Sequence, residues 1–115
     1  MYNDQEKFEI AVMTKIISEN PELSTKLKKQ YDSAIIVNRE FTGVGFFTTF
    51  EITDKTSRLE NYLNLELGNT QARIEGLEFG AGFVLFVRNG LIELLECFSY
   101  GGETWPSQVI SFSLE

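Results

Sequence analysis

The sequence predicts one α+β domain over residues 1–115, in which two N-terminal helices pack on a mainly antiparallel sheet of five or six strands. Apolar residues recur every three or four positions in the first third, and at every second position from Ala34 onward. An Asn-Gly pair at 89–90 then separates two apolar runs. With 115 residues, 43% of them hydrophobic and 23% charged, the chain has the size and composition of one globular domain.

The first third of the chain predicts two helices. An apolar stripe and a capping-box pattern indicate a helix from about 4 to 19, the stripe being Phe8, Val12 and Ile16 and the box Asn3 with Glu6. A second, shorter helix is expected with Pro21 in its first turn, and its apolar stripe comprises Leu23, Leu27 and Tyr31. Three lysines, at 26, 28 and 29, lie opposite that stripe, and we interpret them as a solvated face that complements the helix dipole.

Two hairpins and one further strand are expected after Ala34. The first hairpin spans about 34–52 with its turn at Thr42-Gly43. In its first strand, one face carries Ile35, Val37, Arg39 and Phe41. In its second strand, one face carries Val44, Phe46, Thr48, Phe50 and Ile52. A strand near 71–78 follows. Asn89-Gly90 supplies the positive φ angles of a type I′ turn and therefore predicts the second hairpin.

Taking Asn89-Gly90 as a two-residue loop gives the second hairpin an expected register. The core face then pairs Val87 with Ile92, Leu85 with Leu94, Phe83 with Glu96 and Ala81 with Phe98. The opposite face is still too apolar to lie bare in water. We expect helices on one side of the sheet, and a C-terminal segment, a second copy of the chain or a partner on the other.

Two absences exclude many kinds of chemistry. The chain has no histidine and one cysteine, Cys97, so it lacks the residues of a Ser-His-Asp relay, a Cys-His pair or a zinc cluster. We expect no catalytic residue, no metal and no cofactor, and we interpret Cys97 as a small buried side chain. The first six residues show no signal-peptide pattern and no long apolar run occurs, so we expect a cytoplasmic protein that enters no membrane.

The charge of the chain is unevenly distributed. The net charge is −7, and residues 58–115 hold three arginines and eight glutamates. Negative charge disfavours binding to nucleic acid, because phosphate backbones need basic residues. It is typical of a soluble surface, and it would also attract a basic partner protein.

Six side chains stand out as candidates for a site. Arg39 and Glu96 both fall on faces expected to be apolar, so they could form a buried ion pair with each other. Glu93, Tyr100, Glu103 and Trp105 combine acidic and aromatic groups within and just after the second hairpin, which is typical of a protein-binding surface. The alternative for Trp105 is that it closes one end of the core.

The stretches 39–48, 82–86 and 95–106 together resemble a group of small bacterial α+β proteins. The last stretch includes Tyr100-Gly101 and Trp105-Pro106. Some members of this group resemble the immunity proteins of toxin systems. The resemblance lies in strands and turns, so it implies a fold and a bacterial origin, and it assigns no functional residue.

These observations predict a binding protein and not an enzyme. The most concrete hypothesis is an immunity-type protein that neutralises a basic toxin domain through its acidic, aromatic-bearing C-terminal half. The alternative is a small-ligand-binding or carboxylate-dependent enzyme domain with Arg39 and Glu96 in one pocket. A self-associating domain that covers its second sheet face by forming a homodimer is a third reading.

Overall fold

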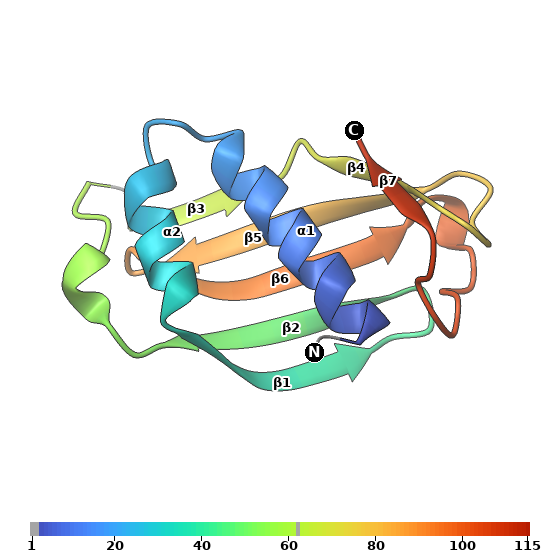
Figure 1. Cartoon of the computed structure of the whole chain (residues 1–115), viewed down its shortest axis with the longest axis horizontal. Helices are drawn as coiled ribbons and strands as arrows, with labels where there is room; N and C mark the ends of the chain where they lie inside the picture. Colours follow the sequence, from blue (N-terminus) through green and yellow to red (C-terminus); the bar gives the residue numbers. More distant parts are fainter. Residues whose placement is uncertain (1–2, 62) are drawn as a thin grey trace.

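The computed structural model describes residues 3–61 and 63–115, so Met1 and Tyr2 of the amino-terminal stretch lie outside the described residues. Two helices precede a seven-stranded sheet in which every recorded strand pair is antiparallel (Figure 1). The predicted α+β class is therefore confirmed, with seven strands in place of five or six. The elements are α1 Asp4–Ser18, α2 Ser24–Asp32, β1 Ala34–Phe41, β2 Gly45–Ile52, a 3-10 turn Lys55–Ser57, β3 Asn64–Leu67, β4 Gln71–Ile74, β5 Ala81–Arg88, β6 Leu91–Ser99, a second 3-10 turn Tyr100–Gly102 and β7 Phe112–Leu114.

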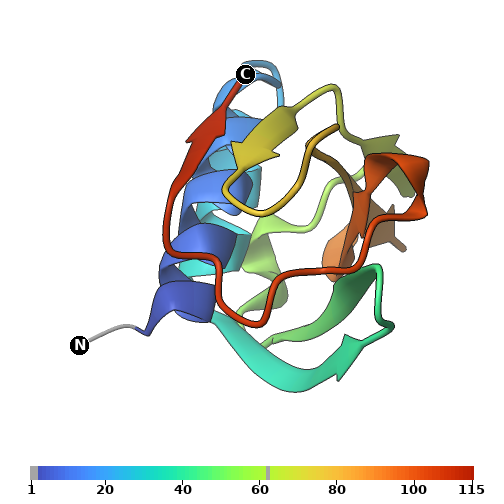
Figure 2. The same ribbon diagram turned by 90° about the vertical axis from the view of Figure 1, so that its right-hand side faces the viewer.

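The sheet has the strand order β1-β2-β6-β5-β4-β7, with β3 paired to β5 as well. Both helices lie on the same face of this sheet, which gives the molecule two layers (Figure 2). The helix α1 begins where the capping pattern predicts, because the Oδ1 atom of Asn3 accepts the main-chain N–H of Glu6 at 2.8 Å. It buries one stripe against the sheet, consisting of Phe8, Glu9, Val12, Met13, Ile16 and Ile17.

The core lies between the helices and the covered face of the sheet. Alternate residues of the three central strands point into it, as a period of two requires. These side chains are all buried: Phe46, Phe50 and Ile52 of β2, Phe83, Leu85 and Val87 of β5, and Ile92, Leu95 and Cys97 of β6. The predicted shared face of Phe46, Thr48, Phe50 and Ile52 is thus confirmed, whereas Val44 lies before β2 and is 41% exposed.

A β-bulge in β6 changes the predicted register of the second hairpin. Val87 pairs with Ile92 as expected, but Phe86 pairs with Leu94, so Glu93 is the extra residue. Every later residue of β6 is consequently shifted by one position. Leu95 and Cys97 point into the core, and the predicted core positions Leu94, Glu96 and Phe98 point to the other side.

A second bulge, at Val37, has the same effect in β1. Ile36 pairs with Phe50 and Arg39 pairs with Thr48, whereas Val37 has no partner in the register. The predicted common face is therefore confirmed for Arg39 and Phe41 and wrong for Ile35 and Val37, because the extra residue places Ile36 on the same side as Arg39, toward the helices.

The C-terminal segment does not cover the second face of the sheet. Its last strand, β7, pairs with β4 at one end of the sheet order. The ring of Phe112 lies 5.0 Å from that of Phe8, on the helix side. Among the described residues, no helix has the length and apolar character needed to cross a membrane.

Candidate functional site

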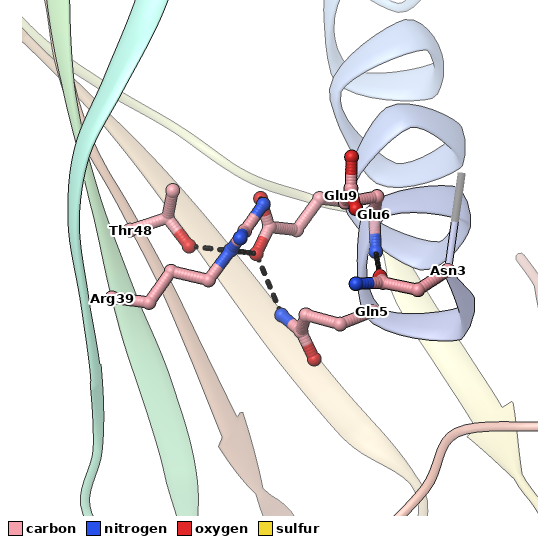
Figure 3. A network of polar contacts seen from close by, with 6 residues as sticks. All are labelled: Asn3, Gln5, Glu6, Glu9, Arg39 and Thr48. Carbon is pink, nitrogen blue, oxygen red and sulfur yellow. Dashed lines mark hydrogen bonds and ion pairs between the residues drawn. The ribbon is translucent and has the colours of Figure 1, made fainter. Parts of the chain in front are cut away.

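A buried ion pair joins α1 to β1, and Figure 3 shows its surroundings. The guanidinium of Arg39 donates to both carboxylate oxygens of Glu9, from Nε at 2.6 Å and from Nη2 at 3.0 Å. The hydroxyl of Thr48 and the side-chain amide of Gln5 also donate to Oε2 of Glu9, at 2.9 Å and 2.6 Å. Glu9 is only 2% exposed, so this carboxylate is removed from solvent and held by three side chains.

The main role of this network is structural. The hydrogen bond with Glu9 raises the pKa of Arg39, an effect that outweighs the opposing effect of partial burial. A buried ion pair whose charges are satisfied by further hydrogen bonds fixes how α1 sits on β1 and β2. Glu9 was missed from sequence, although its place between Phe8 and Val12 on the buried stripe of α1 was a usable signal.

The predicted pairing of Arg39 with Glu96 is wrong. Arg39 points to the helix side, whereas the bulge in β6 turns Glu96 to the other side of the sheet. The two residues therefore cannot line one pocket. The geometry required by the enzyme or small-ligand alternative is not formed.

The side of the sheet that faces away from the helices is covered by no helix and no strand of the described chain (Figure 2), and the 3-10 turn Tyr100–Gly102 lies at one end of it. We call it the open face. Its centre consists of large apolar side chains that are only partly buried, contributed by β2, β5 and β6: Phe47, Val84, Phe86, Leu94 and Phe98. Acidic side chains stand among and around them: Glu40, Glu51, Glu66 and Glu96.

Tyr100 extends the apolar part of the open face. Its ring packs edge to face on Phe98, with centroids 5.8 Å apart and an interplanar angle of 84°. Gly82, the cross-strand partner of Phe98, makes room for both rings. A Cβ at Gly82 would lie 2.5 Å from the hydroxyl oxygen of Tyr100 and 2.9 Å from the Phe98 ring, so both rings would have to shift to admit it.

Trp105 is buried, and the carboxylate of Glu103 is engaged by main-chain groups. The indole of Trp105 is 9% exposed and lies 5.7 Å from the ring of Phe46 and 6.2 Å from that of Phe8, so it closes one end of the core. The carboxylate of Glu103 accepts the main-chain N–H groups of Glu78 and Phe79, at 2.9 Å and 3.0 Å. It therefore holds two loops together. The alternative expected for Trp105 is therefore confirmed, and its predicted role as a partner contact is wrong. The contact role of Glu103 stays a prediction.

Glu93 is exposed, but its setting differs from the one expected. As the bulge residue it lies at the turn end of β6, where it lines a shallow cavity with Glu51, Arg58 and Arg88. The guanidinium of Arg88 stacks 5.0 Å above the ring of Phe86. This end of the sheet is therefore of mixed charge, and Tyr100 lies at the other end. The four predicted contact residues do not form one patch.

Comparison with known proteins adds no further constraint on this site: no family model, curated protein or solved structure matches the chain. The candidate interface therefore depends on the geometry of the open face.

Proposed function

We propose that the chain is a cytoplasmic immunity-type protein, which binds a basic toxin domain and neutralises it by covering its working surface. The observation that supports this function is the open face, an aromatic and acidic sheet surface left uncovered by both helices and by the C-terminal segment. Contiguous apolar surface on a monomer is typical of a protein-binding site.

The composition of the open face favours a basic protein as the partner. Four glutamates, at 40, 51, 66 and 96, point to this side, and two arginines accompany them: Arg88, and Arg73 of β4, which is paired with Glu115. Phe47 lies between Glu40 and Glu96 in the strand register, so an aromatic anchor is flanked by two carboxylates. Such a surface would attract a basic partner over a distance and then bury the rings at the contact.

Neutralisation would occur by occlusion and would need no chemistry from this chain. The rings of Phe86, Phe98 and Tyr100 supply the contact area, and the carboxylates speed association and orient the partner. This assignment keeps Tyr100 as a contact residue and replaces Glu103 and Trp105 with residues of β5 and β6.

The direct test is co-expression with the product of the neighbouring open reading frame, scored by bacterial growth and by recovery of a complex. The expected result is growth arrest by that product alone, relief by this chain, and co-purification of the two. A neighbouring product that is harmless, or that is toxic and neither bound nor relieved, contradicts the proposal.

A matched pair of variants tests whether the open face is the surface used. Glu66→Lys with Glu96→Lys reverses two charges on this face, and Glu22→Lys with Glu75→Lys makes the same change in net charge elsewhere at exposed positions. The open-face variant should associate at least about tenfold more slowly at low salt, with little change in the control. Equal slowing in both variants would mean that net charge alone matters and that another surface binds.

A further inference from the structure

The strand β1 forms one edge of the sheet and pairs only with β2 among the described residues (Figure 1). It is eight residues long, whereas β7, at the other end of the strand order, has three. The main-chain N–H and C=O groups along its outer side therefore have no strand to pair with in the described part of the chain.

This edge is unusually apolar for a strand exposed to solvent. Three consecutive side chains, Ile35, Ile36 and Val37, are 51%, 42% and 52% exposed. Natural proteins protect such edges with lysine, proline, a bulge or an inward-pointing charge. β1 contains neither lysine nor proline, and it has a bulge at Val37 and one inward-pointing charge, Arg39, which is engaged by Glu9. The exposed run 35–37 itself carries no charge.

The space beside this edge on the helix side is acidic. A cavity of about 340 Å³ lies between the helices and β1, lined by Glu6 and Glu9 of α1, Asp32 of α2 and Ile36 and Arg39 of β1, among others. Arg39 is the one cation of this lining and is already engaged by Glu9, so Glu6 and Asp32 have no ion-pair partner of their own among the described residues. On the open-face side of the same edge stand Glu40 and Glu51.

We propose that β1 takes an extended segment of the partner as an added strand, with basic side chains alternating with apolar ones. Pairing with the free edge would supply main-chain hydrogen bonds, and alternate side chains would fall on the two faces. One basic side chain would enter the cavity toward Glu6 and Asp32, and apolar side chains would cover Ile35 and Val37. A second copy of the chain fits less well, because it would bring the same carboxylates together. The basic character of the segment rests on the proposed function.

The test uses the full chain and a capped peptide of about ten residues that alternates lysine with valine, matching a strand that runs the length of β1. Amide shifts and hydrogen exchange are followed by NMR. The expected result is binding with a dissociation constant of about 1 mM or tighter, with slowed exchange of β1 amides. Glu6→Gln with Asp32→Asn should weaken binding at least about fivefold, and Glu22→Gln with Glu75→Gln should not.

Four outcomes would overturn this inference. They are an absence of binding, equal binding by a peptide N-methylated at alternate residues, shifts confined to the open face, and a dimer of the chain that is lost in Val37→Lys. The third of these would leave the proposed function standing, because the open face would still bind a basic partner. Conversely, the peptide could bind at the edge while Glu66→Lys with Glu96→Lys leaves association with the toxin unchanged. That result would support binding at β1 and contradict the use of the open face.

Discussion

The side-chain carbonyl of Gln30 accepts the main-chain N–H of Ile92 at 2.8 Å, although the two residues lie 62 positions apart. The amide nitrogen of the same side chain donates to the carbonyl oxygens of Ser57 and Gly90, at 2.8 Å and 2.9 Å. Gln30 is fully buried. One side chain of α2 thus satisfies three buried main-chain groups at the turn end of β5 and β6, which ties the helix layer to the sheet.

Replacing Gln30 with leucine should lower the free energy of unfolding by about 2–4 kcal/mol, because the main-chain groups of Ile92 and Ser57 lose their side-chain partner and the Gly90 carbonyl keeps only the N–H of Leu59. The measurement is the urea midpoint, with the dependence on urea concentration unchanged. Gln108→Leu, at an exposed position, is the control and should leave the midpoint in place. Equal stability of the Gln30→Leu protein would show that water or rearrangement replaces these bonds.

Removing one partner of the ion pair between α1 and β1 should lower the free energy of unfolding far more than removing both partners together. Arg39→Met leaves the carboxylate of Glu9 buried without its main partner, and we expect a loss of about 3 kcal/mol. Adding Glu9→Leu removes the unpaired buried charge and should restore most of the lost stability. A double variant as unstable as Arg39→Met alone would contradict this account. Chemical denaturation of the four proteins of this cycle measures the coupling.

Gly82→Ala should disturb the Phe98–Tyr100 pair on the open face. The added Cβ would fall 2.5 Å from the Tyr100 hydroxyl and 2.9 Å from the Phe98 ring, and we expect a loss of about 1–3 kcal/mol in stability. In a Tyr100→Ala background part of this clash is absent, so the same substitution should cost less. Thermal unfolding and near-ultraviolet circular dichroism of the four proteins are the measurements.

The thiol of Cys97 should make the folded state sensitive to alkaline pH. Burial raises its pKa well above the ordinary value, with smaller contributions from Glu9 and Glu96. Above about pH 8.5 the unfolded chain releases this proton while the folded chain keeps it, so unfolding becomes more favourable by about 1.4 kcal/mol per pH unit. The wild type should therefore lose stability relative to Cys97→Ala as the pH rises from 8 to 10. Parallel stability curves would contradict this assignment.

Periodicity and turn chemistry predicted the parts of the fold that depend on local sequence. The stripe of Phe8, Val12 and Ile16 lies in the core, and α1 begins at the Asn3 cap. The Asn89-Gly90 turn forms with both residues at positive φ. These features result from interactions between residues that are close in sequence, and the sequence alone therefore predicts them.

The candidate site depended on features that periodicity does not contain. The residue types around Val37 and Glu93 give no sign that a bulge occurs there. Each bulge nevertheless moves the later residues of its strand to the side opposite the one that strict alternation predicts. The partner of Arg39 lies on a helix thirty residues earlier, so a strand register alone could not supply it. Trp105 is buried by long-range packing on Phe8 and Phe46, which the local sequence could not decide between a contact residue and a side chain that closes the core.

The bulge at Glu93 gives β6 one residue more than its pairing with β5 needs. Deleting Glu93 would remove the bulge and leave Phe86 paired with Leu94 and Leu85 with Leu95, so Glu96 and Cys97 would keep their present sides. One residue inserted after Leu94 would instead turn Glu96 toward the core and Cys97 away from it. Diverging descendants of this gene should therefore lose a residue at position 93 more readily than they gain one further along the strand.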